Sequence, residues 1–169
     1  MSNIDNKADN ERILEICIEI EQCSADLYRY FARIFADFPG MAKLWEKTAQ
    51  EEDNHANQFI LAIKLRKLKV IDDVTADIIN AGSFLTLVKS ISEGVKIIKP
   101  GRIDALATAL DLEEKLAAFH ADGVAHFVDE KYKKLFTAMM QADRNHIETL
   151  QKAYQKLTAG SADWQERNR

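Results

Sequence analysis

Apolar residues recur every three or four positions over most of this 169-residue chain, the spacing of one buried face on an α-helix. The pattern predicts four long helices, over about residues 10 to 36, 41 to 68, 102 to 125 and 130 to 158. The first break falls at DFPG, residues 37 to 40, and the third helix begins after Pro100 and Gly101. Asp129 is the expected N-cap of the fourth helix. Scarce glycine (6) and proline (2) likewise favour an all-α chain.

The connection between the second and third helices, residues 69 to 101, is too long for a tight turn and contains a short helix predicted over residues 83 to 98. Two helical hairpins joined by one long crossover define the ferritin-like variant of the four-helix bundle. We therefore predict a single all-α, ferritin-like domain over residues 1 to 169. Trp164 is expected to anchor the C-terminal stretch or to contact another subunit.

The two hairpins are expected to be copies of each other, because their second helices carry the same inward pattern. In the first hairpin the inward positions are Leu44, Thr48, Glu52, His55, Phe59 and Ala62. In the second hairpin, with the same steps of 4, 4, 3, 4 and 3, they are Leu135, Met139, Asp143, His146, Leu150 and Ala153. The other helix of each hairpin carries one inward glutamate, Glu21 or Glu113.

Polar side chains therefore interrupt all four apolar stripes. They are Glu21, Glu52, His55, Glu113, Asp143 and His146. Each of the four acids lies about 15 residues, or roughly 23 Å of helix, from its own hairpin turn, so all four are expected near mid-bundle. Glu51 and Asp53 flank the stripe, and at least one of them should face solvent.

Unpaired carboxylates in an apolar core would cost on the order of several kcal/mol each, and no lysine or arginine lies nearby on the same stripes. A pair of metal ions supplies the missing charge. One glutamate from each of two helices, with an acid-x-x-His pair from each of the other two, is the ligand set of dinuclear carboxylate bundles. Carboxylate and imidazole donors suit iron or manganese. The alternative is a bundle without metal, whose charged residues face solvent.

Other polar residues near these stripes allow more than one assignment. Tyr28 is expected either to hydrogen-bond a ligand carboxylate or to pack in the core, and His120 to be a second-shell donor, an additional ligand or neither. Cys17 is expected to be a small core residue, and His126 is given no role. Cys17 and Cys23 point to different faces of one helix, so they form neither a disulfide framework nor a CxxC pair.

The charge pattern bears on partners and location. The net charge is −4, and no basic stripe interleaved with aromatic residues is present, so we expect no nucleic-acid or membrane partner. No apolar run approaches the roughly 18 residues of a membrane span, and MSNIDNKADNER does not read as a signal peptide. We expect a soluble, cytoplasmic protein.

Four motifs together resemble the rubrerythrin-like branch of the ferritin-like superfamily. They are IEQCSADLY (20 to 28), EEDNH (51 to 55), LEEKLAAFH (112 to 120) and ADRNH (142 to 146). The resemblance implies that the six inward polar residues are di-iron ligands, with Glu52 and Asp143 placed to bridge the two ions.

The sequence also departs from that family's pattern. The two CxxC motifs of a rubredoxin domain are missing from these 169 residues, which implies a separate electron-donor protein. The family's additional helix-three glutamate is replaced by Leu116, and Asp143 is one methylene shorter than the usual glutamate. The position of the bacterioferritin haem methionine is Asp53, so no haem is expected.

The preferred hypothesis is a non-haem di-iron oxidoreductase that reduces peroxide or dioxygen, with two iron ions, or manganese or a mixed pair in their place. One alternative is ferrous oxidation followed by iron storage or transfer. Another is a non-catalytic bundle, metal-free or with a structural metal, that binds a partner protein. A homo-oligomer is expected, and a homodimer is compatible with the duplicated hairpins.

Overall fold

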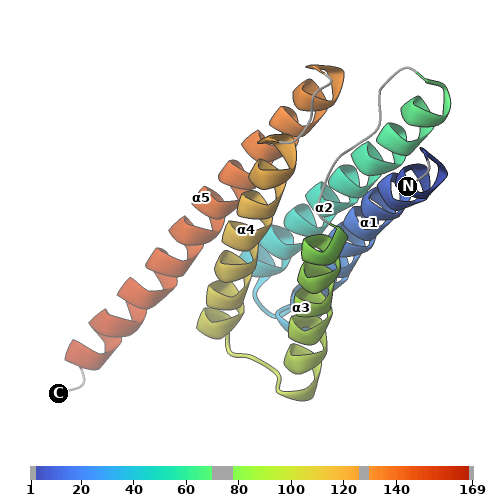
Figure 1. Ribbon diagram of the computed structural model, residues 1–169. Helices are drawn as coiled ribbons and strands as arrows, with labels where there is room; N and C mark the ends of the chain where they lie inside the picture. Colours follow the sequence, from blue (N-terminus) through green and yellow to red (C-terminus); the bar gives the residue numbers. More distant parts are fainter. Residues whose placement is uncertain (1–2, 70–77, 126–129, 168–169) are drawn as a thin grey trace.

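The computed structural model describes the backbone of residues 3–69, 78–125 and 130–167, and side chains chiefly within 11–69, 79–121 and 137–159. The described backbone forms five helices, shown in Figure 1: α1 (Asn3–Ile34), α2 (Pro39–Lys67), α3 (Ile78–Ile97), α4 (Arg102–Ala125) and α5 (Glu130–Arg167). The predicted all-α fold of two hairpins and a crossover helix is confirmed. No helix in this part of the chain is both long and apolar enough to cross a bilayer.

The predicted helices lie in the expected parts of the chain, but several begin or end at other residues than predicted. Helix α1 begins at Asn3, seven residues before the expected start, and α5 continues to Arg167, nine residues past the expected end. The crossover helix α3 is also longer than predicted, with 20 residues. The expected roles of Asp129 and the side chain of Trp164 fall outside the described residues, as does His126.

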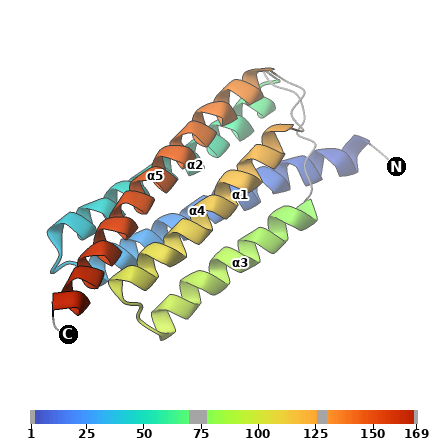
Figure 2. The same ribbon diagram turned by 90° about the vertical axis from the view of Figure 1, so that its left-hand side faces the viewer.

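The turn between α1 and α2 is set by proline chemistry. Pro39 is the first residue of α2, where its missing N–H costs no helical hydrogen bond and its fixed φ suits the first turn. The preceding residue, Phe38, supplies no side-chain cap. The chain therefore reverses within a few residues, so α1 and α2 lie antiparallel along most of their length (Figure 2).

The core lies between the α1–α2 hairpin and the α4–α5 hairpin, and α3 lies along the outside against α1 (Figures 1 and 2). Tyr30 Oη of α1 donates to the carbonyl of Val95 in α3 at 3.1 Å. Phe84 of α3 stacks on Phe119 of α4, with ring centroids 5.1 Å apart. The crossover helix thus binds both hairpins and fixes α4 beside α1.

One end of the core is filled by aromatic rings that fix the position of Tyr28. Trp45 and Phe31 are fully buried, with centroids 5.0 Å apart, and Trp45 stacks on Tyr28 at 5.8 Å. Large aromatic side chains packed in this way contribute much of the burial energy of a small domain. The ring of Tyr28 is held rigidly, with its hydroxyl directed at the polar middle of the bundle.

Candidate metal centre

The structure brings all six predicted ligand residues into one buried region at mid-bundle. They are Glu21 of α1, Glu52 and His55 of α2, Glu113 of α4, and Asp143 and His146 of α5, each 0–4% exposed. Spacing of three residues places each acid and its histidine on one helical face, and the apolar residues around them turn that face inward.

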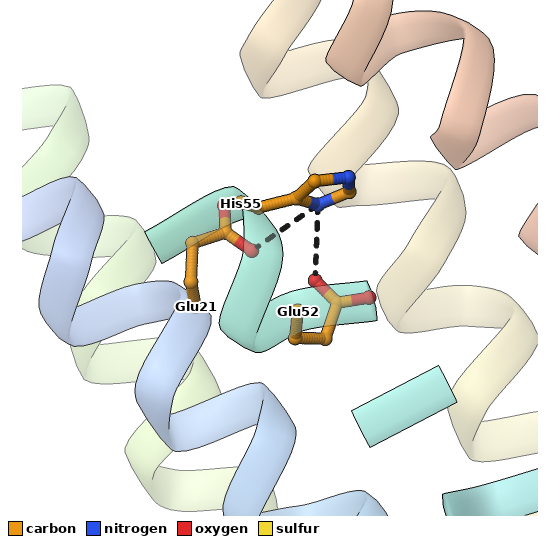
Figure 3. Close-up of side chains that lie close together, drawn as sticks. All are labelled: Glu21, Glu52 and His55. Carbon is orange, nitrogen blue, oxygen red and sulfur yellow. Dashed lines mark ion pairs between the residues drawn. The ribbon is translucent and has the colours of Figure 1, made fainter. Parts of the chain in front are cut away.

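One group of three ligand residues joins α1 to α2. His55 Nδ1 lies 3.4 Å from Glu52 Oε2 and 3.7 Å from Glu21 Oε2, and Figure 3 shows the three side chains converging. Their ligand atoms all lie within 4.8 Å of one another. A single cation placed among them could therefore contact two carboxylates and one imidazole.

A second group of three joins α2 to the other hairpin. His146 Nδ1 lies 3.2 Å from Glu52 Oε1 and 3.4 Å from Glu113 Oε2. These ligand atoms also lie within 4.8 Å of one another. Glu52 belongs to both groups and turns one oxygen toward each histidine, which is the arrangement expected of a bridging carboxylate.

Asp143 is close to these groups but belongs to neither. Its Oδ2 lies 2.8 Å from His120 Nδ1, and its Oδ1 lies 3.8 Å from His55 Nδ1. The side chain is one methylene shorter than glutamate, and its carboxylate is turned toward His120. A bridging role for Asp143 stays a prediction, whereas its burial beside the centre is observed.

Tyr28 and His120, for which the sequence allows alternative roles, contact the centre directly. Tyr28 Oη of α1 donates to Glu113 Oε1 of α4 at 2.5 Å. His120 of α4 places Nε2 at 2.9 Å from Glu21 Oε1 of α1, in addition to its contact with Asp143. Each of these rings thus reaches a carboxylate of the opposite hairpin.

Glu51 is a residue that the sequence pattern did not assign to the centre. Its side chain is 31% exposed, and its Oε2 lies 2.7 Å from His146 Nε2. A carboxylate on the second nitrogen of a ligating histidine orients the ring and raises its basicity. Asp53, on the other flank of the stripe, instead pairs with Arg29 at the surface. Both acids are adjacent to the inward position, so helical spacing alone did not separate them.

Charge coupling dominates the electrostatics of the centre. Burial alone would lower the pKa of His55 and of His146, but the neighbouring carboxylates raise these to about 10 and about 11. Burial alone would raise the pKa of Glu21, but His120 and His55 lower it to about 2. Burial and the nearby Glu52 raise the pKa of Glu113 to about 7. Without metal, protonated histidines therefore balance the buried carboxylates.

Several buried polar atoms of this network lack a hydrogen-bond partner, which bears on whether these residues could bind a metal ion. They include Glu21 Oε2, Glu52 Oε1 and His55 Nδ1. Nε2 of His146 also has no hydrogen bond, although Glu51 Oε2 lies 2.7 Å away. Buried polar atoms are normally paired, and a cation bound by oxygen and imidazole lone pairs would satisfy the first three. Carboxylates and imidazoles without thiolate suit iron or manganese, so the residues fit such ions.

Buried carboxylates and histidines that four helices direct to one centre are typical of metal-binding helical bundles, and two groups of these residues could each hold a metal ion. The rubrerythrin family model matches residues 12–154, a range that includes every residue of the centre. The chain belongs to the rubrerythrin family. Searches of curated proteins and of solved structures gave no match.

Proposed function

We propose that this chain is a non-haem di-iron oxidoreductase that reduces peroxide or dioxygen. The observation that carries the proposal is the position of Glu52, which is shared by two groups of metal-ligating atoms, each completed by one further glutamate and one histidine. Membership of the rubrerythrin family supports iron as the metal.

Each ion would have its own ligands and one shared ligand. Glu21 and His55 would hold one ion, Glu113 and His146 the other, and Glu52 would contact both. When bound, the two ferrous ions would supply the two electrons needed to cleave an O–O bond. Reduction of one hydrogen peroxide to two waters consumes these two electrons and two protons.

The residues of the chain control orientation, water access and protons. Tyr28 fixes one oxygen of Glu113 through its hydroxyl, and so leaves the other oxygen turned toward His146. Burial of the four acids and the histidines excludes bulk water from the centre. Glu51 is the partly exposed carboxylate that lies 2.7 Å from His146 Nε2, so it would be the group through which protons move between solvent and this ring.

Electrons would come from a donor site outside these 169 residues. The two cysteines of this sequence, Cys17 and Cys23, are six positions apart and do not form the CxxC pairs of a rubredoxin site. Cys17 is buried, and burial raises the pKa of its thiol far above the usual range, so it is a poor candidate for thiol redox chemistry.

The test is a single-turnover reaction with the full chain loaded anaerobically with ferrous iron. One equivalent of hydrogen peroxide per chain should oxidise both irons, followed by absorbance of the ferric product in stopped flow. Glu113→Gln should lose this reaction, whereas Glu114→Gln, an exposed neighbour on α4, should retain it. Iron oxidation by dioxygen into a ferric mineral inside a large assembly, with no reaction with peroxide, would instead indicate iron storage.

A further inference from the structure

We propose that His120 is a positioning residue that makes the two metal positions unequal. In this arrangement His120 holds Glu21 and Asp143 for the ion at the Glu21–His55 group, while Tyr28 holds Glu113 for the other ion. The inference rests on the binding of two ions proposed above. It adds that two rings at corresponding positions in the two hairpins support the ligands of different ions.

The duplicated hairpins identify Tyr28 and His120 as counterparts. Tyr28 comes seven residues after Glu21, and His120 comes seven residues after Glu113. Their contacts are also equivalent, because Tyr28 reaches Glu113 and His120 reaches Glu21 in the opposite hairpin. The difference is chemical. A phenol has one polar atom, whereas an imidazole has two, on opposite sides of the ring.

The second nitrogen of His120 contacts Asp143, the acid whose side chain is one methylene shorter than glutamate. Nδ1 lies 2.8 Å from Asp143 Oδ2, so the ring links Asp143 to Glu21 across the bundle. The next contact of Asp143 with the centre, from Oδ1 to His55 Nδ1, is 3.8 Å long. His120 therefore determines the rotation of the Asp143 carboxylate and directs its other oxygen toward the half of the centre that contains His55.

The orientation of the His120 ring is itself fixed by packing. The residue is 3% exposed, and its ring lies beside Phe59 and Phe119, with centroid distances of 6.0 and 5.9 Å. It meets the ring of His55 edge-on at 6.2 Å. A ring enclosed in this way keeps both nitrogens in place before metal arrives, as a support for ligands requires.

The same contacts favour support over direct ligation. The two nitrogens of His120 lie at hydrogen-bond distance from two different carboxylates, so both are already engaged by the side chains that they support. His120 is also absent from both groups of three atoms that could hold an ion. His55 and His146, in contrast, turn Nδ1 toward the shared Glu52.

The other half of the centre has different supports. Tyr28 fixes Glu113, and Glu51 contacts the outer nitrogen of His146. The counterpart of Glu51 in the second hairpin is Ala142, which has no group able to contact His55 in the same way. The two positions should therefore differ in affinity and respond to different substitutions.

The test uses the metal-free full chain and cobalt(II), with affinities from isothermal titration calorimetry and site occupancy from anomalous diffraction. His120→Phe keeps a ring beside Phe59 but removes both nitrogens, and Tyr28→Phe is its matched control in the other hairpin. We expect His120→Phe to lower the affinity for one ion by about 10- to 100-fold, and the loss of occupancy should fall at the position beside Glu21 and His55. Tyr28→Phe should lower the affinity for the ion beside Glu113 and His146. His120→Gln, which keeps an amide near the carboxylates, should recover part of the loss.

The outcomes separate this inference from the proposed function. Wild-type protein that binds fewer than two ions would overturn the proposed function and the inference with it. Two ions in wild type, with His120→Phe either unchanged or weakened equally at both positions, would overturn the inference alone. Anomalous density bonded to a His120 nitrogen would also overturn it, because His120 would then be a ligand. If His120→Phe does not fold, the site-specific loss in His120→Gln decides between these results.

Discussion

Metal binding to this centre should release protons in a predictable number. In the metal-free protein the pKa values of His55 and His146 are about 10 and about 11, so both rings carry an additional proton at pH 7. Each ring must lose that proton to offer its Nδ1 lone pair to a metal ion. Burial and the nearby Glu52 raise the pKa of Glu113 to about 7, so this carboxyl retains part of its proton near neutral pH and must also ionise.

Together these groups predict the release of about two to three protons per chain when two ions bind near pH 7. The number should fall toward two as the pH rises, because Glu113 loses its proton before the two histidines do. His120 does not contribute if it remains bound to Glu21 and Asp143.

Calorimetric titration of the metal-free chain with cobalt(II) measures this number. The observed enthalpy is plotted against the ionisation enthalpy of several buffers at one pH, and the slope gives the protons released. Glu114→Gln, which changes an exposed acid beside Glu113, should give the wild-type slope. Binding of two ions with fewer than one proton released would refute the reasoning that the buried histidines are cationic without metal.

Three further results follow from the same structure. Glu52→Ala should abolish binding of both ions, because Glu52 belongs to both groups of ligand atoms. Glu46→Ala, which changes an exposed residue of the same helix, should leave both ions bound. Two ions retained by Glu52→Ala in metal analysis would contradict the shared role of Glu52. Phe31→Ala should lower the free energy of unfolding by about 3–5 kcal/mol in a urea titration, because the ring is fully buried against Trp45. A loss below about 1 kcal/mol would contradict that packing. The melting temperature of the metal-free protein should fall between pH 7 and 10. His55, His120 and His146 have folded-state pKa values raised above 6.5, so their stabilisation is complete below pH 6.5 and is lost as the pH rises through about 10 to 11. A melting temperature that rises over this range would contradict the assignment.

Helical periodicity was sufficient to predict the bundle and to bring six polar residues to one level. Inward positions on a long helix repeat every three or four residues, so Glu52 and His55 could be assigned to the buried face from spacing alone. The distances of Glu21 and Glu113 from their turns then placed them at the same height. These inferences need only helix geometry and the positions of the turns.

Contacts within the centre depend on details that spacing does not contain. Glu51 and Asp53 flank the stripe almost equally, and the rotation of α2 decides that Glu51 contacts His146 while Asp53 pairs with Arg29 at the surface. The double contact of His120 depends on the distance between α1, α4 and α5, which packing in three dimensions sets. The ends of α1 and α5 were also misplaced, since terminal turns depend on weak local preferences.

One chain is predicted to bind two metal ions through a shared Glu52. The most direct measurement is the iron content of the full chain after anaerobic loading with ferrous iron and removal of unbound metal, with the ions located by anomalous diffraction. Two irons per chain, one beside Glu21 and His55 and one beside Glu113 and His146, with Glu52 contacting both, are the predicted result. One iron or none per chain, or ions located away from Glu52, would show that Glu52 does not join two metal ions.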